Sequence, residues 1–143
     1  MRPRRRHARD LALQVLFQHD VGRLPIDEAL ATARRADADA DWLFVEALCR
    51  GTVGCAAELD AAITPLLEGW TIDRLANIDR AILRLAIYEL RYLSTPPGVV
   101  INEAVELAKR YGTETSGAFV NGVLGALERE RQLADEPRPT RGH

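Results

Sequence analysis

IDRLANIDRAILRLAIYELRYL, residues 72–93, is the stretch of sequence that decides the fold, and neither Gly nor Pro interrupts it. Its apolar residues recur at spacings of three and four, which is the period of one face of an α-helix. That face consists of Leu75, Ile78, Ile82, Leu85, Ala86 and Leu93, and other apolar residues widen it. A helix that is apolar over so much of its circumference is usually buried by several neighbours. The stretch therefore predicts one continuous central helix in an all-α domain.

Two acidic residues do not fit this apolar face. Glu89 projects into its middle, and Asp79 lies on its flank. A carboxylate on a buried face needs hydrogen bonds or an arginine to offset its desolvation, so we expect Glu89 to have such a partner inside the fold. For Asp79, one interpretation is a local ion pair with Arg80 or Arg84.

Length and composition favour one helical domain. The chain has 143 residues, enough for one domain with a real core. Its hydrophobic fraction of 47% argues against overall disorder. Aromatic residues are few, at 6%, while Ala and Leu are abundant, which favours helices over sheets. We expect residues 1–132 to form the domain and residues 133–143 to form a polar tail.

The remaining sequence predicts further helices between clusters of turn residues. They cover residues 4–20, 26–36, 41–63 and 99–111, and a last helix begins at residue 116 and becomes polar from residue 130. Gly51 and Gly54 suggest a bend or a close helix approach within residues 41–63. Asp39 or Asp41 is expected to cap that helix, and Thr71 to cap the central one. Pro65 is expected to end the long helix or to open a short extra turn.

The cysteines and the hydropathy point to a reduced, cytoplasmic protein. Cys49 and Cys55 have no further ligand at zinc spacing, so we interpret them as small core residues and expect no metal site. No run of 18 apolar residues is present, which predicts no membrane-spanning helix and no membrane partner.

The N-terminus is basic although the net charge of the chain is −2. The cluster consists of Arg2, Arg4, Arg5, Arg6 and Arg9. Such a segment can bind a polyanion even in a mildly acidic protein. It contributes little to the helix itself, because cations at a helix N-terminus oppose the macrodipole. The alternative interpretation is a solvated terminus without a ligand.

The motifs of several enzyme classes are missing from the sequence. It contains no phosphate-binding glycine loop, no zinc-protease helix and no nucleophile elbow. No catalytic residue and no cofactor is therefore predicted. A site assembled from separate helices would not be visible in the sequence, but a binding protein is the better interpretation.

Three segments, in order, resemble one protein family. They are RRRHARDLALQVLFQ (residues 4–18), NIDRAILRLAIYEL (residues 77–90) and INEAVELAKRYGTETSGAFVNGVL (residues 101–124). Together they are similar to the bacterial transcription antitermination factor NusB family. The resemblance covers nearly the whole chain, and the INEAVELAK and FVNGVL blocks make it specific.

The resemblance implies a fold and a function. Family members have about seven helices in two packed bundles, and they are not enzymes. They bind the single-stranded boxA element of nascent ribosomal RNA together with NusE, which is also a small-subunit ribosomal protein. The pair helps to load an antitermination complex, with other Nus factors, onto RNA polymerase. Some members form homodimers, so the second hypothesis is a module that binds only proteins or itself.

The resemblance also implies which residues contact RNA. They are Arg4, Arg5, Arg6, His7, Arg9, Thr115 and Ser116. The planar guanidinium of arginine suits this task, because it pairs with phosphates and stacks on bases. His7 stands where Arg or Lys is common in the family, and Thr115 stands where some members carry an acid.

A second set is expected to face NusE. It consists of Phe17, Asp73, Asp79 and Phe119. An interface position would explain why Asp79 lies off the apolar stripe. Core packing is an equally good interpretation for Phe17 and Phe119, and the helix dipole explains Asp73 as well as a partner does.

Overall fold

The computed structural model describes residues 3–135, except for the side chain of Pro3, and contains helices but no strand in this part of the chain. The predicted all-α class is thus confirmed. The elements are α1 (Pro3–Asp20), α2 (Ile26–Ala36), α3 (Trp42–Gly54), α4 (Ala56–Ile63), the 3-10 turns η1 (Thr64–Leu66) and η2 (Ile72–Arg74), α5 (Asn77–Tyr92), α6 (Pro97–Tyr111) and α7 (Ser116–Asp135).

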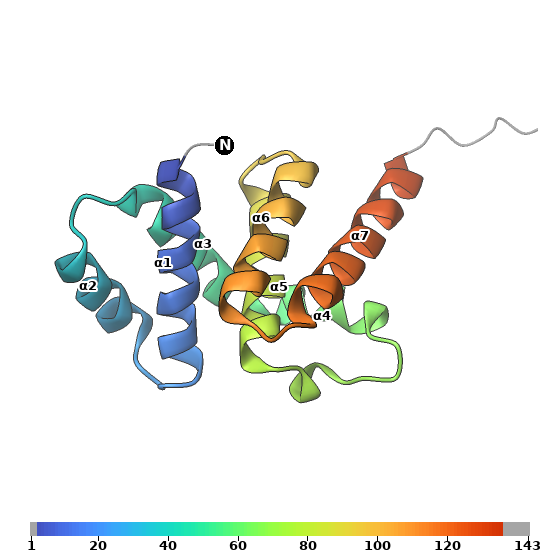
Figure 1. Ribbon diagram of the computed structural model, residues 1–143, viewed down its shortest axis with the longest axis horizontal. Helices are drawn as coiled ribbons and strands as arrows, with labels where there is room; N and C mark the ends of the chain where they lie inside the picture. The colour runs from blue at the N-terminus through green and yellow to red at the C-terminus, as the bar shows by residue number, and fades with distance from the viewer. Residues whose placement is uncertain (1–2, 136–143) are drawn as a thin grey trace, which may run out of the picture.

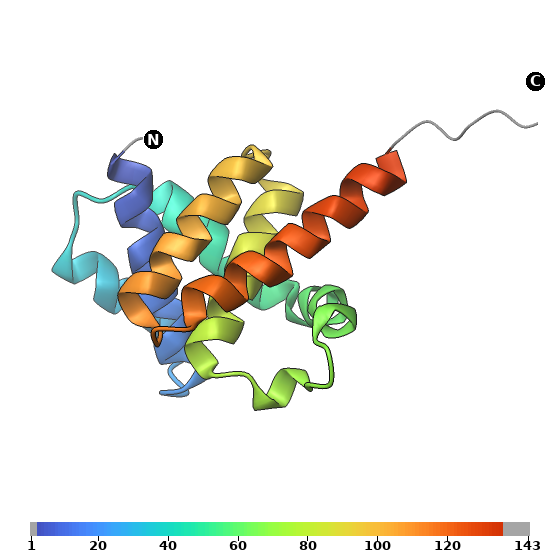
Figure 2. The same ribbon diagram turned by 45° about the vertical axis from the view of Figure 1, so that its right-hand side comes forward.

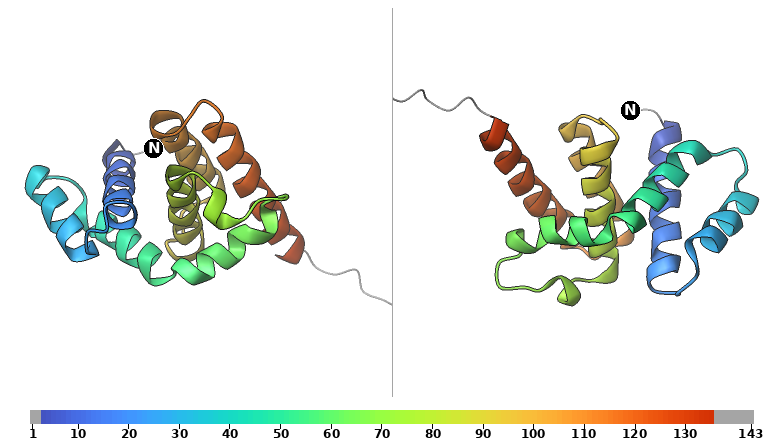
Figure 3. Two further views of the ribbon diagram at one scale, coloured as in Figure 1. Left: turned by 90° about the horizontal axis from the view of Figure 1, so that it is seen from below. Right: turned by 180° about the vertical axis from the view of Figure 1, so that it is seen from behind.

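The helices form two bundles that share one core. Helices α1, α2 and α3 pack together on one side, and α4 to α7 pack on the other (Figure 1). Helix α1 also contacts α5, and α3 runs on into α4 across the back of α5 (Figure 3). Helix α7 lies along α6 at the far end of the molecule (Figure 2). Every helix thereby buries its apolar side against another one.

The central helix is shorter than predicted. Helix α5 begins at Asn77, because Ala76 is extended (φ −56°, ψ 139°) and separates it from the 3-10 turn η2. Thr71 precedes η2 and makes no capping bond, so its predicted role was wrong. Ile72 and Leu75 still pack against the core, which explains why the apolar period continues across the break. From Asn77 onward the helix is buried as expected, with eight buried residues.

The predicted helix over residues 41–63 is divided at Cys55 into α3 and α4. Asp41 caps α3 as expected, since its Oδ1 accepts a hydrogen bond from the Phe44 amide at 3.3 Å. Gly51 lies where α3 meets α5, and a Cβ there would be 1.9 Å from Cζ of Tyr88. Cys49 is buried, as expected for a core residue, whereas Cys55 is half-buried.

The C-terminal helix is longer than the sequence suggested. Helix α7 continues to Asp135, so residues 133–135 of the expected tail are helical. The rest of that tail, residues 136–143, lies outside the described residues.

Candidate nucleic-acid interface

The first turns of α1 carry the basic cluster, and its exposed members lie against the loop between α2 and α3. Arg4 donates from Nη1 to the carbonyl of Asp39 at 2.9 Å. His7 Nε2 lies 2.6 Å from Oδ2 of Asp37. Both side chains are exposed, so these contacts are within reach of a competing phosphate.

Arg5 stacks on an aromatic ring. Its guanidinium carbon lies 4.4 Å from the ring centroid of Phe44, and that of Arg9 lies 5.3 Å from the same centroid. Such cation–π contacts hold a guanidinium plane in a defined orientation. Phe44 is buried and stands among apolar residues of α3, so the sequence indicated only a core role for it.

Arg9 is buried rather than displayed to solvent. The residue is 2% exposed, and its Nε and Nη2 donate to the two carboxylate oxygens of Glu89 at 2.8 and 2.5 Å. The expectation that Glu89 has an arginine partner inside the fold is confirmed. The same pairing places Arg9 away from any surface that RNA could reach, because its charge is used to compensate a buried carboxylate.

The guanidinium of Arg6 is hydrogen-bonded along one edge, and its other edge has no hydrogen bond to a described residue. Its Nε and Nη2 donate to Oε1 and Oε2 of Glu103 at 3.1 and 2.8 Å, and Nη1 of Arg9 lies 3.9 Å from the same carboxylate. The hydrogen bonds from Arg6, followed by the charges of Arg6 and Arg9, hold the pKa of the Glu103 carboxyl below its usual value. The Arg6 side chain is 43% exposed, and its Nη1 makes no hydrogen bond to another described residue. That outer edge can bind a phosphate.

The two remaining residues of the expected RNA-binding set lie elsewhere. Thr115 is exposed in the loop between α6 and α7. Ser116 is buried, and its Oγ accepts a hydrogen bond from the Thr113 amide at 3.0 Å, so it shapes the loop instead of facing a ligand. Glu103 lies eight residues before the end of α6 at Tyr111, which corresponds to about 12 Å of helical rise, and the loop with Thr115 follows. Arg6 and Thr115 therefore belong to one site only if the ligand is extended.

Asp79 lines a groove of about 460 Å³ beside this loop. The groove is lined by Trp70, Arg74, Leu75, Ala76, Asp79, Thr113, Thr115 and Phe119. It brings together Asp79, Phe119 and Thr115, which the sequence had assigned to two different surfaces. Trp70, 59% exposed, and Arg74 were not predicted, because their positions follow from the break before α5.

The interpretation of Asp79 as half of a local ion pair is wrong. Arg80 donates to Asp20 and Asn77, and Arg84 donates to Asp60. Oδ1 of Asp79 is buried without a hydrogen bond to any described residue. The carboxylate thus borders the groove without a hydrogen bond that would compensate its buried oxygen.

The last two residues of the expected partner set lie outside this groove. Asp73 is exposed on η2. Phe17, on α1, is 37% exposed and borders a separate hollow beside Tyr111, so it is not a core residue.

Residues 3–135 contain no group of three or more His, Cys, Asp or Glu side chains that could hold a metal ion. No helix within the same range is long and apolar enough to cross a membrane.

The protein is small and all-helical, with two bundles. It carries a half-exposed arginine that pairs with a buried carboxylate, and an open groove that is bordered by an unpaired acid. These features define the class of small helical binding proteins. A sequence model of the NusB family matches residues 6–129. The chain belongs to the NusB family.

Known proteins support this assignment over most of the chain. The transcription antitermination protein NusB of Geobacillus kaustophilus is 48% identical over 126 residues, which are 87% of this chain and 95% of that protein. A crystal structure of the antitermination factors NusB and NusE in complex with double-stranded RNA matches with a TM-score of 0.82 and 33% identity, covering 91% of this chain and 99% of that one. A crystal structure of a plectonemic RNA supercoil contains a chain that matches with a TM-score of 0.86 and 32% identity, covering 94% of this chain and all of that one.

Proposed function

We propose that this protein is a transcription antitermination factor that binds the boxA element of nascent ribosomal RNA together with NusE. The observation that carries the proposal is the match to a NusB protein in complex with NusE and RNA, over 91% of the chain. In this role the protein acts in the cytoplasm as a binding adaptor and not as an enzyme. It contributes to an antitermination complex, with other Nus factors, on RNA polymerase.

The RNA-binding surface begins at the first turns of α1. Arg5 and Arg6 supply the cationic edges, because Arg5 is exposed while it stacks on Phe44 and Arg6 is half-exposed while its inner edge binds Glu103. Arg4 and His7 join them when a phosphate displaces their contacts with the loop between α2 and α3. Thr115 meets a more distant part of the same strand. Arg9 and Ser116 act as positioning residues, since both are buried.

The NusE surface is the groove around Asp79 and Phe119. Its apolar lining, with the exposed Trp70 beside an unpaired carboxylate, suits a protein partner that supplies an apolar side chain and a cation. Asp73 extends this surface along η2.

Titration of a fluorescein-labelled boxA RNA, with and without the cognate NusE, tests both surfaces. Replacing Arg5 and Arg6 together by Ala should weaken RNA binding about tenfold or more and leave the affinity for NusE nearly unchanged, because two phosphate contacts are lost. Asp79→Lys should weaken NusE binding far more than RNA binding. Equal effects of both variants on both ligands would refute the division into two surfaces, and a wild-type protein that binds no RNA even with NusE would refute the function.

A further inference from the structure

We propose that a pocket at the back of the molecule binds a small apolar α-amino acid. The pocket has a volume of about 230 Å³ and lies between the C-terminal end of α1, the junction of α3 with α4, and the first half of α5. None of its lining residues belongs to the RNA or NusE surfaces proposed above. The site is therefore an addition to the proposed function and does not depend on it.

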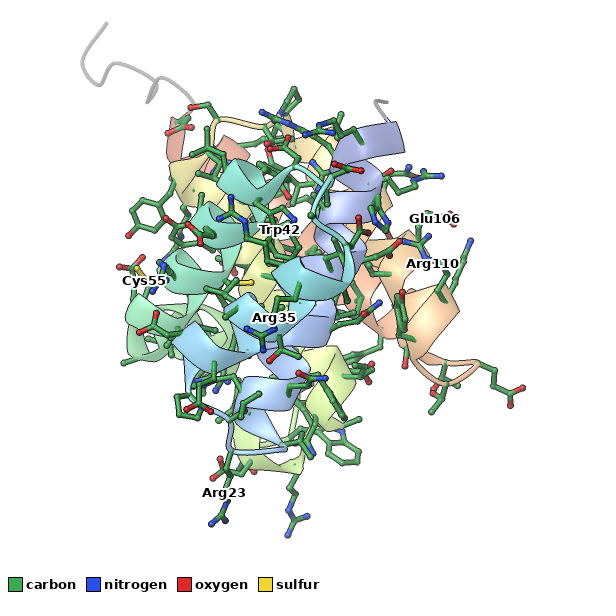
Figure 4. All side chains as sticks on the ribbon, turned by 90° about the vertical axis from the view of Figure 1, so that its left-hand side faces the viewer. Arg23, Arg35, Trp42, Cys55, Glu106 and Arg110 are labelled. Carbon is green, nitrogen blue, oxygen red and sulfur yellow. The ribbon has the colours of Figure 1, made fainter. Side chains whose placement is uncertain are left out.

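The pocket lies away from α6. Val53 and Ala56 of its wall stand on either side of Cys55, which separates α3 from α4. Figure 4 shows Cys55 and Arg110 of α6 at opposite edges of the molecule, with α1 between them in this view. Within residues 3–135, the lining includes no residue of α6 or α7. A ligand bound here would not cover the surface that α1 forms with α6.

A buried hydroxyl without a partner lines the pocket. Thr52 is 3% exposed, and its Oγ1 makes no hydrogen bond to a described residue. A buried polar group that lacks a hydrogen bond is destabilising, so nearly all such groups in folded proteins have a partner. An oxygen atom of a ligand in the pocket would supply the partner of Thr52.

Arg84 offers a second donor group to the same pocket. Its Nε and Nη2 donate to the two carboxylate oxygens of Asp60 at 2.6 and 2.7 Å, while Nη1 makes no hydrogen bond to a described residue. Nη1 and the remaining N–H of Nη2 form the other edge of the guanidinium, whose geometry matches a carboxylate. Thr52 and Arg84 thus suit a ligand with a carboxylate end.

An acceptor of opposite charge also lines the pocket. Asp20 accepts a hydrogen bond from Arg80 at 3.4 Å through Oδ2, and its Oδ1 accepts none from a described residue. The pKa of Arg84 is raised, mainly by the hydrogen bond to Asp60 and to a smaller extent by the charge of Asp20. Asp20 would repel a simple carboxylate, and Arg84 would repel a simple amine. A ligand with both an ammonium and a carboxylate group complements the pair.

The rest of the wall is mostly apolar and leaves room for a small side chain. The apolar residues are Leu16, Val53, Ala56 and Ala81. The ring of His19 is held by a hydrogen bond from Nδ1 to the Leu24 carbonyl at 2.9 Å. The volume of about 230 Å³ corresponds to roughly eight water molecules at ~30 Å³ each, so the ligand has about ten or fewer non-hydrogen atoms. Leucine and valine meet these requirements.

The test is isothermal titration calorimetry of the full chain with L-leucine and L-valine. Isocaproate, which lacks the ammonium group of leucine, and isoamylamine, which lacks the carboxylate, are the matched analogues. Thr52→Val removes the hydroxyl and keeps the shape of the side chain, and Asp20→Asn removes the charge. Thr32→Val is the control, because Thr32 is exposed on α2 and does not line the pocket.

A second pair of variants tests the location by volume. Ala56→Leu places a larger side chain in the pocket, and Ala57→Leu adds the same atoms at the next residue, which is exposed. Circular dichroism shows whether each variant is folded. Ala56→Leu should abolish amino-acid binding, and Ala57→Leu should leave it unchanged.

L-leucine should bind saturably at one site, and each analogue should bind about tenfold more weakly, because one charge-assisted contact is lost. Thr52→Val should weaken leucine binding about fivefold, the loss expected from one hydrogen bond. Asp20→Asn should weaken leucine binding about tenfold and should not weaken isocaproate binding, because the repulsion is removed together with the ammonium partner. Thr32→Val should bind leucine like the wild type.

Three outcomes would overturn the inference. The first is the absence of saturable binding of either amino acid at concentrations up to about 10 mM, well above a millimolar Kd. The second is isocaproate binding as tight as leucine binding, which would show that no ammonium group is recognised. The third is a Thr52→Val variant that binds leucine as tightly as Thr32→Val does, which would place the ligand elsewhere. Failure to bind boxA RNA, measured separately, would refute the proposed function and leave this result untouched.

Discussion

Arg9 and Glu89 form a buried ion pair, with side chains that are 3% and 2% exposed. Such a pair gains little over a well-packed apolar pair, but removal of one partner leaves an uncompensated charge in the core. The sequence predicted that Glu89 needs a partner, and it did not reveal which one. The partner lies 80 residues away, and nothing in the local pattern of α1 marks Arg9 as different from Arg5 or Arg6.

Glu89→Ala should therefore lower the free energy of unfolding by about 3 to 5 kcal/mol. Arg131→Ala provides the control, since Arg131 pairs only along the surface of α7 with Glu128 and should cost less than about 0.5 kcal/mol. Urea unfolding followed by circular dichroism measures both. A loss from Glu89→Ala as small as that of the control would show that the buried pair is not formed.

Glu103 makes the stability depend on pH. Its pKa is lowered in the folded protein by the hydrogen bonds and charges of Arg6 and Arg9. A carboxyl of this kind contributes stability above its unfolded pKa of about 4.3, and this stability is lost as the pH falls through the lower folded value. The difference in free energy of unfolding between the wild type and Glu103→Gln should thus be largest at neutral pH.

That difference should shrink as the pH falls below the unfolded pKa of about 4.3, because the unfolded chain then takes up a proton before the folded protein does. Urea unfolding at a series of pH values between 7 and 3 gives the comparison. A difference that stays constant over this range would contradict the role assigned to the charge of Glu103.

At the scale of elements, α3 approaches α5 closely at Gly51. A Cβ there would lie 1.9 Å from Cζ of Tyr88, so Gly51→Ala should cost about 1 to 3 kcal/mol through overpacking. Gly54→Ala is the matched control in the same helix, because nothing lies within 4 Å of its added Cβ. It should be neutral or stabilising by up to about 1 kcal/mol.

Thermal and urea unfolding of the two variants measure these effects. The cost of Gly51→Ala should largely disappear when Tyr88 is replaced by Leu in the same chain, since the clash is with the ring. If the cost persists without the ring, the close approach of α3 and α5 at this point has another cause.

Local sequence signals predicted a secondary-structure element correctly where no tertiary contact overrode them. The bounds of α2 and the Asp41 cap followed from periodicity and from the preference of Asp for the N-cap. The start of α5 did not, because Ala76 is a good helix former that adopts an extended conformation here. The resulting turn puts Trp70 beside Phe119 and creates a groove that no periodicity could indicate.

For the candidate site, too, the sequence indicated residues but not their tertiary contacts. The resemblance predicted the basic first turns of α1 and Asp79 as site residues. It did not identify the contacts that distinguish Arg6 from Arg9, because these depend on Glu103 and Glu89 of two other helices.

At the scale of the whole molecule, RNA binding through arginines should depend on the salt concentration. If Arg4, Arg5 and Arg6 each neutralise one phosphate, the logarithm of the affinity for single-stranded RNA should fall with the logarithm of salt concentration at a slope of about −2. Arg5→Ala should reduce the steepness by about 0.7, and Arg131→Ala should leave it unchanged.

Fluorescence anisotropy over a potassium chloride series, in the presence of NusE, gives these slopes. An affinity that does not depend on salt would contradict an RNA surface built on arginines. A slope much steeper than about −2 would indicate that further cations, such as the arginine now paired with Glu89, are released to bind RNA.

The ion pair between Arg6 and Glu103 joins two residues that are synthesised at different times. Glu103 follows Arg6 by 97 residues, so a ribosome that adds about 5 to 20 residues per second needs roughly 5 to 20 s to supply it. During that interval the nascent N-terminal segment carries Arg6 and Arg9 without their carboxylates. Both ion pairs can form only after Glu89 and Glu103 have been synthesised and have left the ribosome, so the two arginines remain uncompensated until the chain is nearly complete.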